Sequence, residues 1–200
     1  MAVSVVALLL CGPAAQLPGD SIVYTLAPSS RLEVQTGKAG LLGFAGHEHL
    51  IRARGFSGRI VYRPDAPHES RVEIVVPTES LEVLTPPDTE EIRKVTEAMR
   101  TEVLHVAEYR DIRFVSKAIT PSAGGFRLQG DLTLAGRTHE VTVDVRVTLA
   151  ADTLRATGAF SVKQTDFGIK PYRGGPAGTV RVADRVKFQI ETVGIRASGP

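Results

Sequence analysis

Apolar and polar residues alternate strictly along much of the chain. The clearest run covers residues 141–149 (VTVDVRVTL), in which every odd position is apolar and every even position is polar. Side chains of a β-strand point to opposite faces in turn, so this pattern predicts a strand with one buried and one solvated face. The same alternation predicts strands at residues 71–76, 111–116, 126–134, 154–162 and 180–190.

Two further segments predict strands of less regular form. Residues 22–26 and 32–34 read as a short opening hairpin over Pro28 and Ser29. Within residues 51–62 the alternation changes phase near Gly55, which predicts a bulge or bend at that glycine. Short turn sequences rather than helices separate most of these strands, so antiparallel pairing is expected.

One segment follows a helical period instead. In residues 88–104, Ile92, Val95, Met99 and Val103 recur at spacings of three and four, which predicts an amphipathic helix. Asp88 and Glu91 form the capping-box pattern at its start. The sequence therefore predicts an all-β fold with one inserted α-helix.

Closure of the predicted sheet follows from its exposed edges. An open sheet of about eight strands would leave two unpaired edges, whereas a closed antiparallel barrel has none. The interior of such a barrel is filled by side chains or holds one small ligand. Aromatic residues make up 6% of the chain and Trp is absent, so few large side chains are available to fill it.

The N-terminal residues have the composition of a signal peptide. The apolar run at residues 2–10 is too short to span a bilayer, and the small residues Gly12 and Ala14 follow it, although no basic residue precedes it. We expect a signal peptide and short linker over residues 1–19, a barrel domain over residues 20–196 and a C-terminal tail over residues 197–200. The chain would then be periplasmic or secreted. Cys11, the one cysteine, follows Leu10 where a lipoprotein signal has a small residue, and its lipidation is left open.

Charge and cysteine content exclude several classes of site. The formal net charge is +2 and the charges are interspersed, so we expect no nucleic-acid partner. A single cysteine excludes an internal disulfide and a thiolate metal site. No phosphate-binding glycine loop and no serine nucleophile motif is present, so we expect neither enzymatic activity nor a cofactor.

The sequence His47-Glu48-His49 is the one constellation that invites chemistry. Residues two apart on a strand share a face, so these imidazoles could touch a ligand head group or bind one metal. A catalytic zinc needs three protein ligands, and no third ligand is fixed by spacing. A loop whose imidazoles hydrogen-bond to the backbone explains the pair without any metal, and we predict no metal site.

Several motifs resemble the YceI-like family. Residues 130–141 (GDLTLAGRTHEV) resemble its strand–turn–strand signature, residues 108–116 (EYRDIRFVS) one of its strands, and residues 165–169 (TDFGI) its late turn. Residues 24–30 and 56–58 are similar to shorter family motifs, and the order fits over residues 21–193. Arg110 and Gln164 depart from the family pattern, which usually has Pro and Arg near these positions.

The resemblance implies an antiparallel lipocalin-like barrel whose tunnel holds a polyisoprenoid or isoprenoid quinone in an exported bacterial protein. We therefore expect a lipid carrier, with a metal-dependent enzyme using His47 and His49, or an interaction module with a filled barrel, as alternatives. A transient membrane contact and a homodimer are left open. The expected tunnel residues are apolar side chains on inward faces: Phe44, Phe56, Ile74, Phe114, Leu132, Leu134, Val143, Val145, Phe160, Phe167 and Phe188.

Export is testable on the mature chain. If residues 2–14 form a signal peptide, the protein recovered from fractionated cells should begin near Gln16 or a few residues later. N-terminal sequencing measures this directly. An intact Met1 on protein from the cytoplasm would contradict export.

Overall fold

The computed structural model describes residues 21–38, 48–84, 89–174 and 180–197. The predicted signal peptide, with Cys11, and most of the predicted C-terminal tail lie outside these residues.

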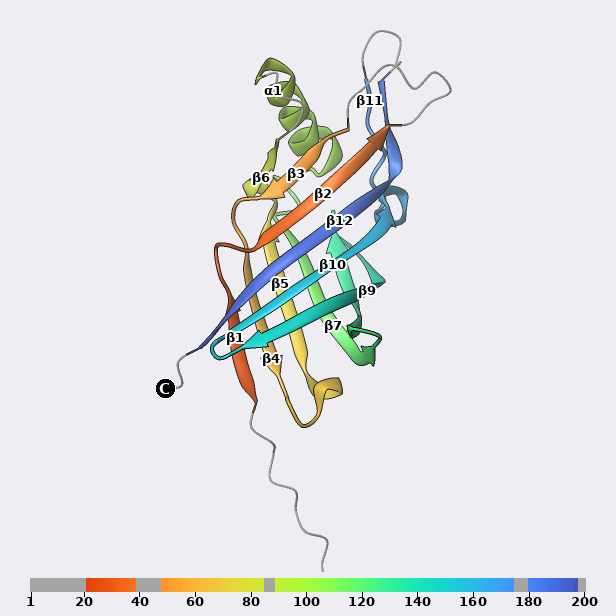
Figure 1. Cartoon of the computed structure of the whole chain (residues 1–200). Coiled ribbons are helices and arrows are strands. Elements are labelled where there is room, and N and C mark those ends of the chain that lie inside the picture. The colour runs from red at the N-terminus through yellow and green to blue at the C-terminus, as the bar shows by residue number, and fades with distance from the viewer. Residues whose placement is uncertain (1–20, 39–47, 85–88, 175–179, 198–200) are drawn as a thin grey trace, which may run out of the picture.

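Eight strands form a closed antiparallel ring (Figure 1). In order around the barrel they are β1 (Ile22–Leu26), β4 (Ser57–Tyr62), β5 (Arg71–Pro77), β7 (Asp111–Ser122), β8 (Gly125–Leu134), β9 (Arg137–Ala150), β10 (Thr153–Lys163) and β12 (Val180–Arg196). Pairing of Tyr24 with Arg196 and of Leu26 with Gly194 closes the ring. The predicted all-β antiparallel barrel is confirmed.

Three further strands extend the barrel at one end. β2 (Arg31–Lys38) pairs with β12, β3 (Leu50–Ala53) pairs with β2, and β6 (Leu81–Val83) pairs with β3. The two-residue strand β11 (Arg173–Gly174) pairs with the start of β12 at the same end. Figure 1 shows β11 and α1 (Thr89–Ala98) at this end, whereas β1 starts at the other.

The predicted opening hairpin is wrong. β1 and β2 do not pair with each other; both run antiparallel to β12, one after the other along the same edge. The turn at Pro28 and Ser29 therefore offsets the strand instead of reversing it. Ser30 bridges the offset, since its hydroxyl Oγ accepts from the Val193 N–H at 2.9 Å and donates to the Val193 carbonyl at 3.3 Å.

The predicted change of phase near Gly55 is confirmed as a break between β3 and β4. A second break lies beside it, where the 3-10 turn η2 (Thr78–Ser80) separates β5 from β6. The two breaks are bonded to each other, because Arg54 N–H donates to the Ser80 carbonyl at 3.0 Å and the Ser80 hydroxyl donates to the Gly55 carbonyl at 2.8 Å. Both strands therefore bend at the same level of the barrel.

The inserted helix follows β6 in the chain and lies against it. α1 continues into the π-helical turn η3 (Met99–Val103), and together they occupy most of the predicted helical segment. Met99 is buried, and Ile92, Val95 and Val103 pack against the main core, so the predicted apolar stripe is confirmed. The capping residue Asp88 lies outside the described residues.

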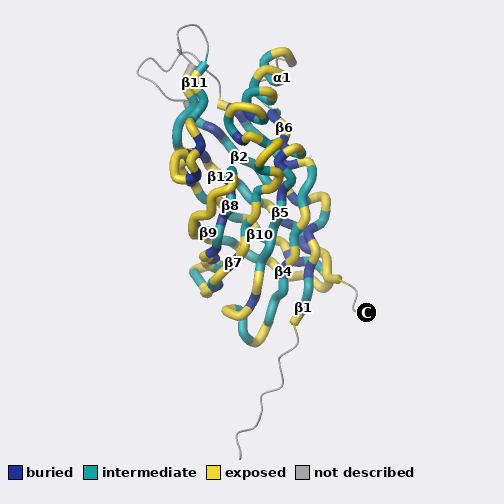
Figure 2. Tube along the Cα trace, turned by 180° about the vertical axis from the view of Figure 1, so that it is seen from behind, coloured by how far each residue is buried: buried dark blue, intermediate teal, exposed yellow. Residues whose placement is uncertain are grey.

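Alternation sets the two faces of the barrel wall. On β8, Leu128, Leu132 and Leu134 are buried whereas Arg127 and Gln129 are exposed. Figure 2 shows buried and intermediate positions interspersed with exposed ones along the strands. The remaining helical turns, η1 (Pro67–Glu69) and η4 (Gln164–Phe167), connect strands at opposite ends of the barrel.

Thr78 joins the bend in β5–β6 to the start of β7 and provides a test of this architecture. Its side chain is 2% exposed, and its hydroxyl lies 2.8 Å from the Tyr109 carbonyl and 2.9 Å from the Arg110 carbonyl. Thr78→Val keeps the shape and removes the donor, so the free energy of unfolding should fall by about 1–3 kcal/mol. Urea unfolding measures this. Thr148→Val, at an exposed position of β9, is the control and should change little; an equal loss in both variants would contradict the role of Thr78.

Candidate binding site: an apolar tunnel with a polar mouth

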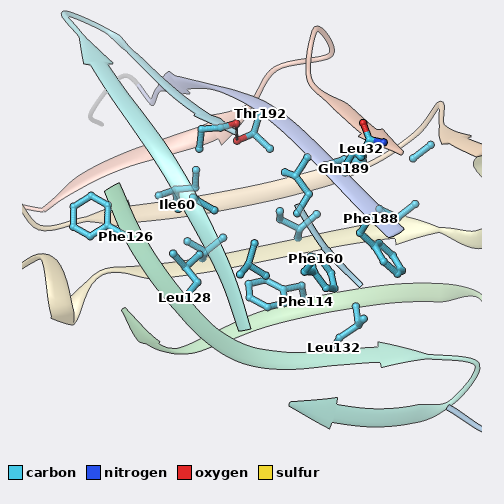
Figure 3. Close-up of a pocket in the computed structure, with 18 of the residues that line it drawn as sticks. Leu32, Ile60, Phe114, Phe126, Leu128, Leu132, Phe160, Phe188, Gln189 and Thr192 are labelled. Atoms are coloured by element: carbon cyan, nitrogen blue, oxygen red, sulfur yellow. Dashed lines mark hydrogen bonds between the residues drawn. The ribbon is translucent and has the colours of Figure 1, made fainter. Parts of the chain in front are cut away.

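The barrel encloses a cavity of ≈ 170 Å³ in its closed part. Inward positions of β4, β5, β7, β8, β9, β10, β12 and β2 line it, because alternation directs every second side chain of these strands inside. Figure 3 shows labelled members of this lining, with Phe126 toward one end and Phe188 toward the other. The lining is almost entirely aliphatic and aromatic.

Most of the predicted tunnel residues lie here together. Those that line this cavity are Ile74, Phe114, Leu132, Val143, Val145, Phe160 and Phe188. Leu132 and Val143 are buried, but Ile74, Phe114, Val145, Phe160 and Phe188 are only partly buried although they point inward. The side chains of the barrel therefore do not fill its interior.

Glycines on the inner face make room for side chains of the neighbouring strands. An ideal Cβ at Gly130 would lie 2.7 Å from the Phe114 ring, so only glycine allows that ring to cross β8. Gly158 lies opposite Val145 in the same way, with 2.9 Å between its ideal Cβ and a Val145 methyl group. Phe160 and Phe188 stack with ring centroids 4.8 Å apart and form a firm aromatic surface across β10 and β12.

Five polar residues line this cavity, Tyr62 among them, and the other four have partners within the protein. Ser70 Oγ accepts from the Arg63 N–H at 3.0 Å, and Thr192 Oγ1 donates to the Ala156 carbonyl at 3.4 Å. Glu33 and Gln189 are likewise bonded, to Arg52 at 2.6 Å and to Gln35 at 3.3 Å. Because these groups are satisfied by the barrel, whatever occupies this cavity meets an apolar environment.

A second cavity of ≈ 350 Å³ lies under α1 at the end of the barrel that carries β11. Val34, Ile51, Leu81, Ile112 and Phe188 line both cavities, so the two are adjacent parts of one tunnel. The predicted tunnel residue Leu134 lines this upper part. Its polar lining comes from separate elements: Thr36, His49, Glu91, Lys94, Gln164, Tyr172 and Arg181. We call this upper cavity the mouth.

His49 is held by β2 at the mouth. Its backbone N–H donates to Thr36 Oγ1 at 3.0 Å, and its carbonyl accepts from the Thr36 N–H at 2.9 Å. The residue is 8% exposed and lines the cavity. Its predicted partner His47 lies outside the described residues, so the structure does not test the pair.

The turn η4 places Gln164 at the mouth. Gln164 is buried, and its Nε2 donates to the Ala183 carbonyl at 2.9 Å. Asp184 holds the turn beside it, because its carboxylate accepts from the Thr165 N–H at 2.9 Å and from the Thr165 hydroxyl at 2.8 Å. The Thr165 backbone hydrogen bond, with help from the hydroxyl, lowers the pKa of Asp184 below its ordinary value.

Two predicted tunnel residues lie elsewhere. Phe56 sits at the β3–β4 break, packed between the two core clusters, and lines neither cavity. Phe167 is 1% exposed in η4 and meets His139 edge-on, with centroids 5.0 Å apart. It lies at the seam where β9 and β10 stop pairing beyond Asp144 and Ala159, and it lines a further cavity there. Phe44 lies outside the described residues.

The polar residues of the mouth other than His49 were not predicted as site residues. Thr36 continues the inward alternation of Leu32 and Val34, so the period-two pattern contains its signal. Lys94 and Arg181 carry no such signal, because α1 and β12 meet around the mouth only through the tertiary fold. Over the described ranges no three His, Cys, Asp or Glu side chains gather as metal ligands, and no helix is long and apolar enough to cross a membrane.

The fold and site define an eight-stranded antiparallel barrel with an internal apolar tunnel and one helix at its mouth. The chain belongs to the YceI-like family, since the model of the YceI-like domain matches residues 26–194. No curated protein matches the sequence.

Solved structures share this fold at low sequence identity. BcnA from Burkholderia cenocepacia is 20% identical, with a TM-score of 0.69 over 84% of this chain and 98% of that one. A polyisoprenoid binding domain from Saccharophagus degradans is 14% identical, with a TM-score of 0.58 over 87% and 98% of the two chains. The YCEI protein of Campylobacter jejuni is also 14% identical, with a TM-score of 0.57 over 74% and 85%.

Asp184 gives the mouth a testable dependence on pH. Its folded-state pKa is lowered, so its carboxylate stabilises the fold fully above the unfolded value of roughly 3.9 and ceases to do so as the pH falls through the folded value. Asp184→Asn should lower the urea midpoint at pH 7, and the difference from the wild type should shrink below about pH 4. Asp152→Asn, in the β9–β10 turn, is the matched control and should leave the midpoint unchanged. A deficit that persists undiminished at low pH would contradict a role for the charge.

Proposed function

We propose that this protein binds a long apolar lipid, of polyisoprenoid or isoprenoid-quinone type, in the barrel tunnel and carries or sequesters it after export. The observation that carries the proposal is the tunnel itself: an apolar interior that the barrel's own side chains leave open, leading to a mouth where polar side chains join the apolar lining. The polyisoprenoid binding domain of Saccharophagus degradans, which shares the fold, supports this ligand class.

The apolar lining favours binding of an apolar chain. Each buried methylene contributes about 0.8 kcal/mol, so ~12 methylenes would give roughly 10 kcal/mol before the cost of association. No polar recognition is needed in the closed part, where polar side chains are few. Binding of this kind needs no catalytic group, and we propose a carrier rather than an enzyme.

The mouth suits the more polar end of such a lipid. Lys94 on α1 and Arg181 on β12 bring cationic groups to its lining, and Tyr172, Thr36 and Gln164 bring neutral polar groups. A chain in the closed part with its head among these residues satisfies both environments. The residues of the predicted head-group contact thus extend beyond His49.

The partial burial of inward-facing side chains argues against the interaction module with a filled barrel. In a filled barrel of this size, side chains such as Phe114 and Val145 would be packed to the density of a protein interior. Both instead keep exposed surface while lining a cavity.

A size change at Val145 tests the tunnel. Val145→Phe should narrow the closed part and lower the amount of lipid extracted from the purified protein, whereas the fold should persist because the cavity accepts the ring. Organic extraction followed by mass spectrometry measures the bound lipid, and a thermal melt of the same preparation measures the melting temperature. Val115→Phe, at a 36% exposed position on the outer face of β7, is the control and should retain both lipid and melting temperature.

The opposite pair of results would refute the carrier. In a filled barrel the added ring overpacks the core and costs about 1–3 kcal/mol. A lower melting temperature for Val145→Phe, with no lipid in either variant or in the wild type, would therefore mean that the interior is not a binding site.

A further inference from the structure

Beside the mouth, cationic side chains face one another across paired strands. Lys163 on β10 lies directly opposite Arg185 on β12, and Arg173 on β11 lies directly opposite Arg181 on β12. Like charges directly opposite each other destabilise a sheet. Both pairs lie along β12, and the pairing of strands alone does not explain why these like charges are placed together.

These four cations and Lys170 form a surface that we call the basic face. All five residues are exposed, and none forms an ion pair with any residue that the structure describes. Carboxylates lie beside them: Asp184 is bonded to Thr165 and attracts Lys163, Asp166 and Glu140 line the same surface hollow as Lys163 and Arg185, and Glu91 lines the mouth with Arg181. The five cations are thus partly neutralised, but they outnumber these carboxylates near the opening of the tunnel.

We propose that the basic face docks the protein on the surface of an anionic phospholipid membrane, with the mouth turned toward the bilayer. The proposal rests on the proposed lipid-binding function. A lipid that leaves the tunnel through water exposes its whole apolar chain, whereas a mouth held against a bilayer passes it from one apolar phase to another. Arg181 belongs to both the basic face and the mouth lining, so the docking surface and the opening are continuous.

The position of the basic face fits this orientation. β11 and α1 stand at the same end of the barrel, and β12 carries Arg181 and Arg185 near its start there (Figure 1). Clusters of Lys and Arg bind anionic leaflets through charge alone, and the attraction falls off within a Debye length. Docking should accordingly be reversible and sensitive to salt.

Co-sedimentation of the full-length protein with lipid vesicles tests the proposal. The protein should bind vesicles of phosphatidylcholine mixed with phosphatidylglycerol, and should not bind phosphatidylcholine alone. Raising the salt from about 0.1 M to about 1 M should release it, since the screening length falls from ~10 Å to ~3 Å.

Two matched double variants locate the surface. Lys163→Gln with Arg185→Gln removes two charges of the basic face, neither of which lines the tunnel, and should weaken vesicle binding roughly 30-fold. Arg146→Gln with Arg155→Gln removes two exposed charges from the part of β9 and β10 near their turn and should bind nearly as the wild type does. Because the first variant also relieves a like-charge pair, its melting temperature should not fall.

Lipid extraction on the same proteins separates this inference from the proposed function. Retained tunnel lipid with no vesicle binding by the wild type would overturn the docking surface and leave the carrier intact. Vesicle binding with no tunnel lipid would overturn the carrier instead. Equal loss of vesicle binding in both double variants would overturn the assignment to the basic face.

Discussion

The pairing of β1 with the last residues of β12 turns this sheet into a container. Without it, the sheet would present two long edges, and the inward faces of all eight strands would meet water. Closure buries those faces and at the same time fixes the diameter, since a ring of about eight strands leaves room for little more than side chains or one ligand. Phe114 and Val145 line the cavity and are only partly buried, which shows that this ring is open inside.

At the end that carries α1, the strands of the ring are interrupted by irregular elements. The bends between β3 and β4 and between β5 and β6 swing the upper strands away from β7, and α1 with η3 occupies the space that results. On the other side, Phe167 is buried at the seam between β9 and β10. Irregular elements thus meet around the mouth, and they bring polar side chains to a place where regular strands would have placed apolar ones.

Much of the fold was accessible from the sequence, because a period of two reports directly on which face of a strand is buried. That pattern found the strands and placed Ile74, Phe114, Val143 and Val145 on the inner face. The pattern does not show which strands are neighbours around the ring. For that reason it wrongly predicts a hairpin for residues 22–34, whose two strands both pair with β12. Phe56 and Phe167 were assigned to the tunnel because apolar character alone does not separate a seam or a bend from a cavity. Lys94 and Arg181 line the same cavity only in the folded protein, and no local sequence pattern indicates that they do.

The pairing of Tyr24 with Arg196 joins residues from nearly opposite ends of the chain. Contacts so distant in sequence are slow to form, because the entropy cost of closing a large loop comes before the stabilisation that the contact gives. The barrel therefore cannot close until its last strand has been synthesised, and a growing chain holds no finished tunnel in which a lipid could be trapped. If the exported chain crosses the membrane before its barrel closes, it acquires its ligand only in the compartment where it works.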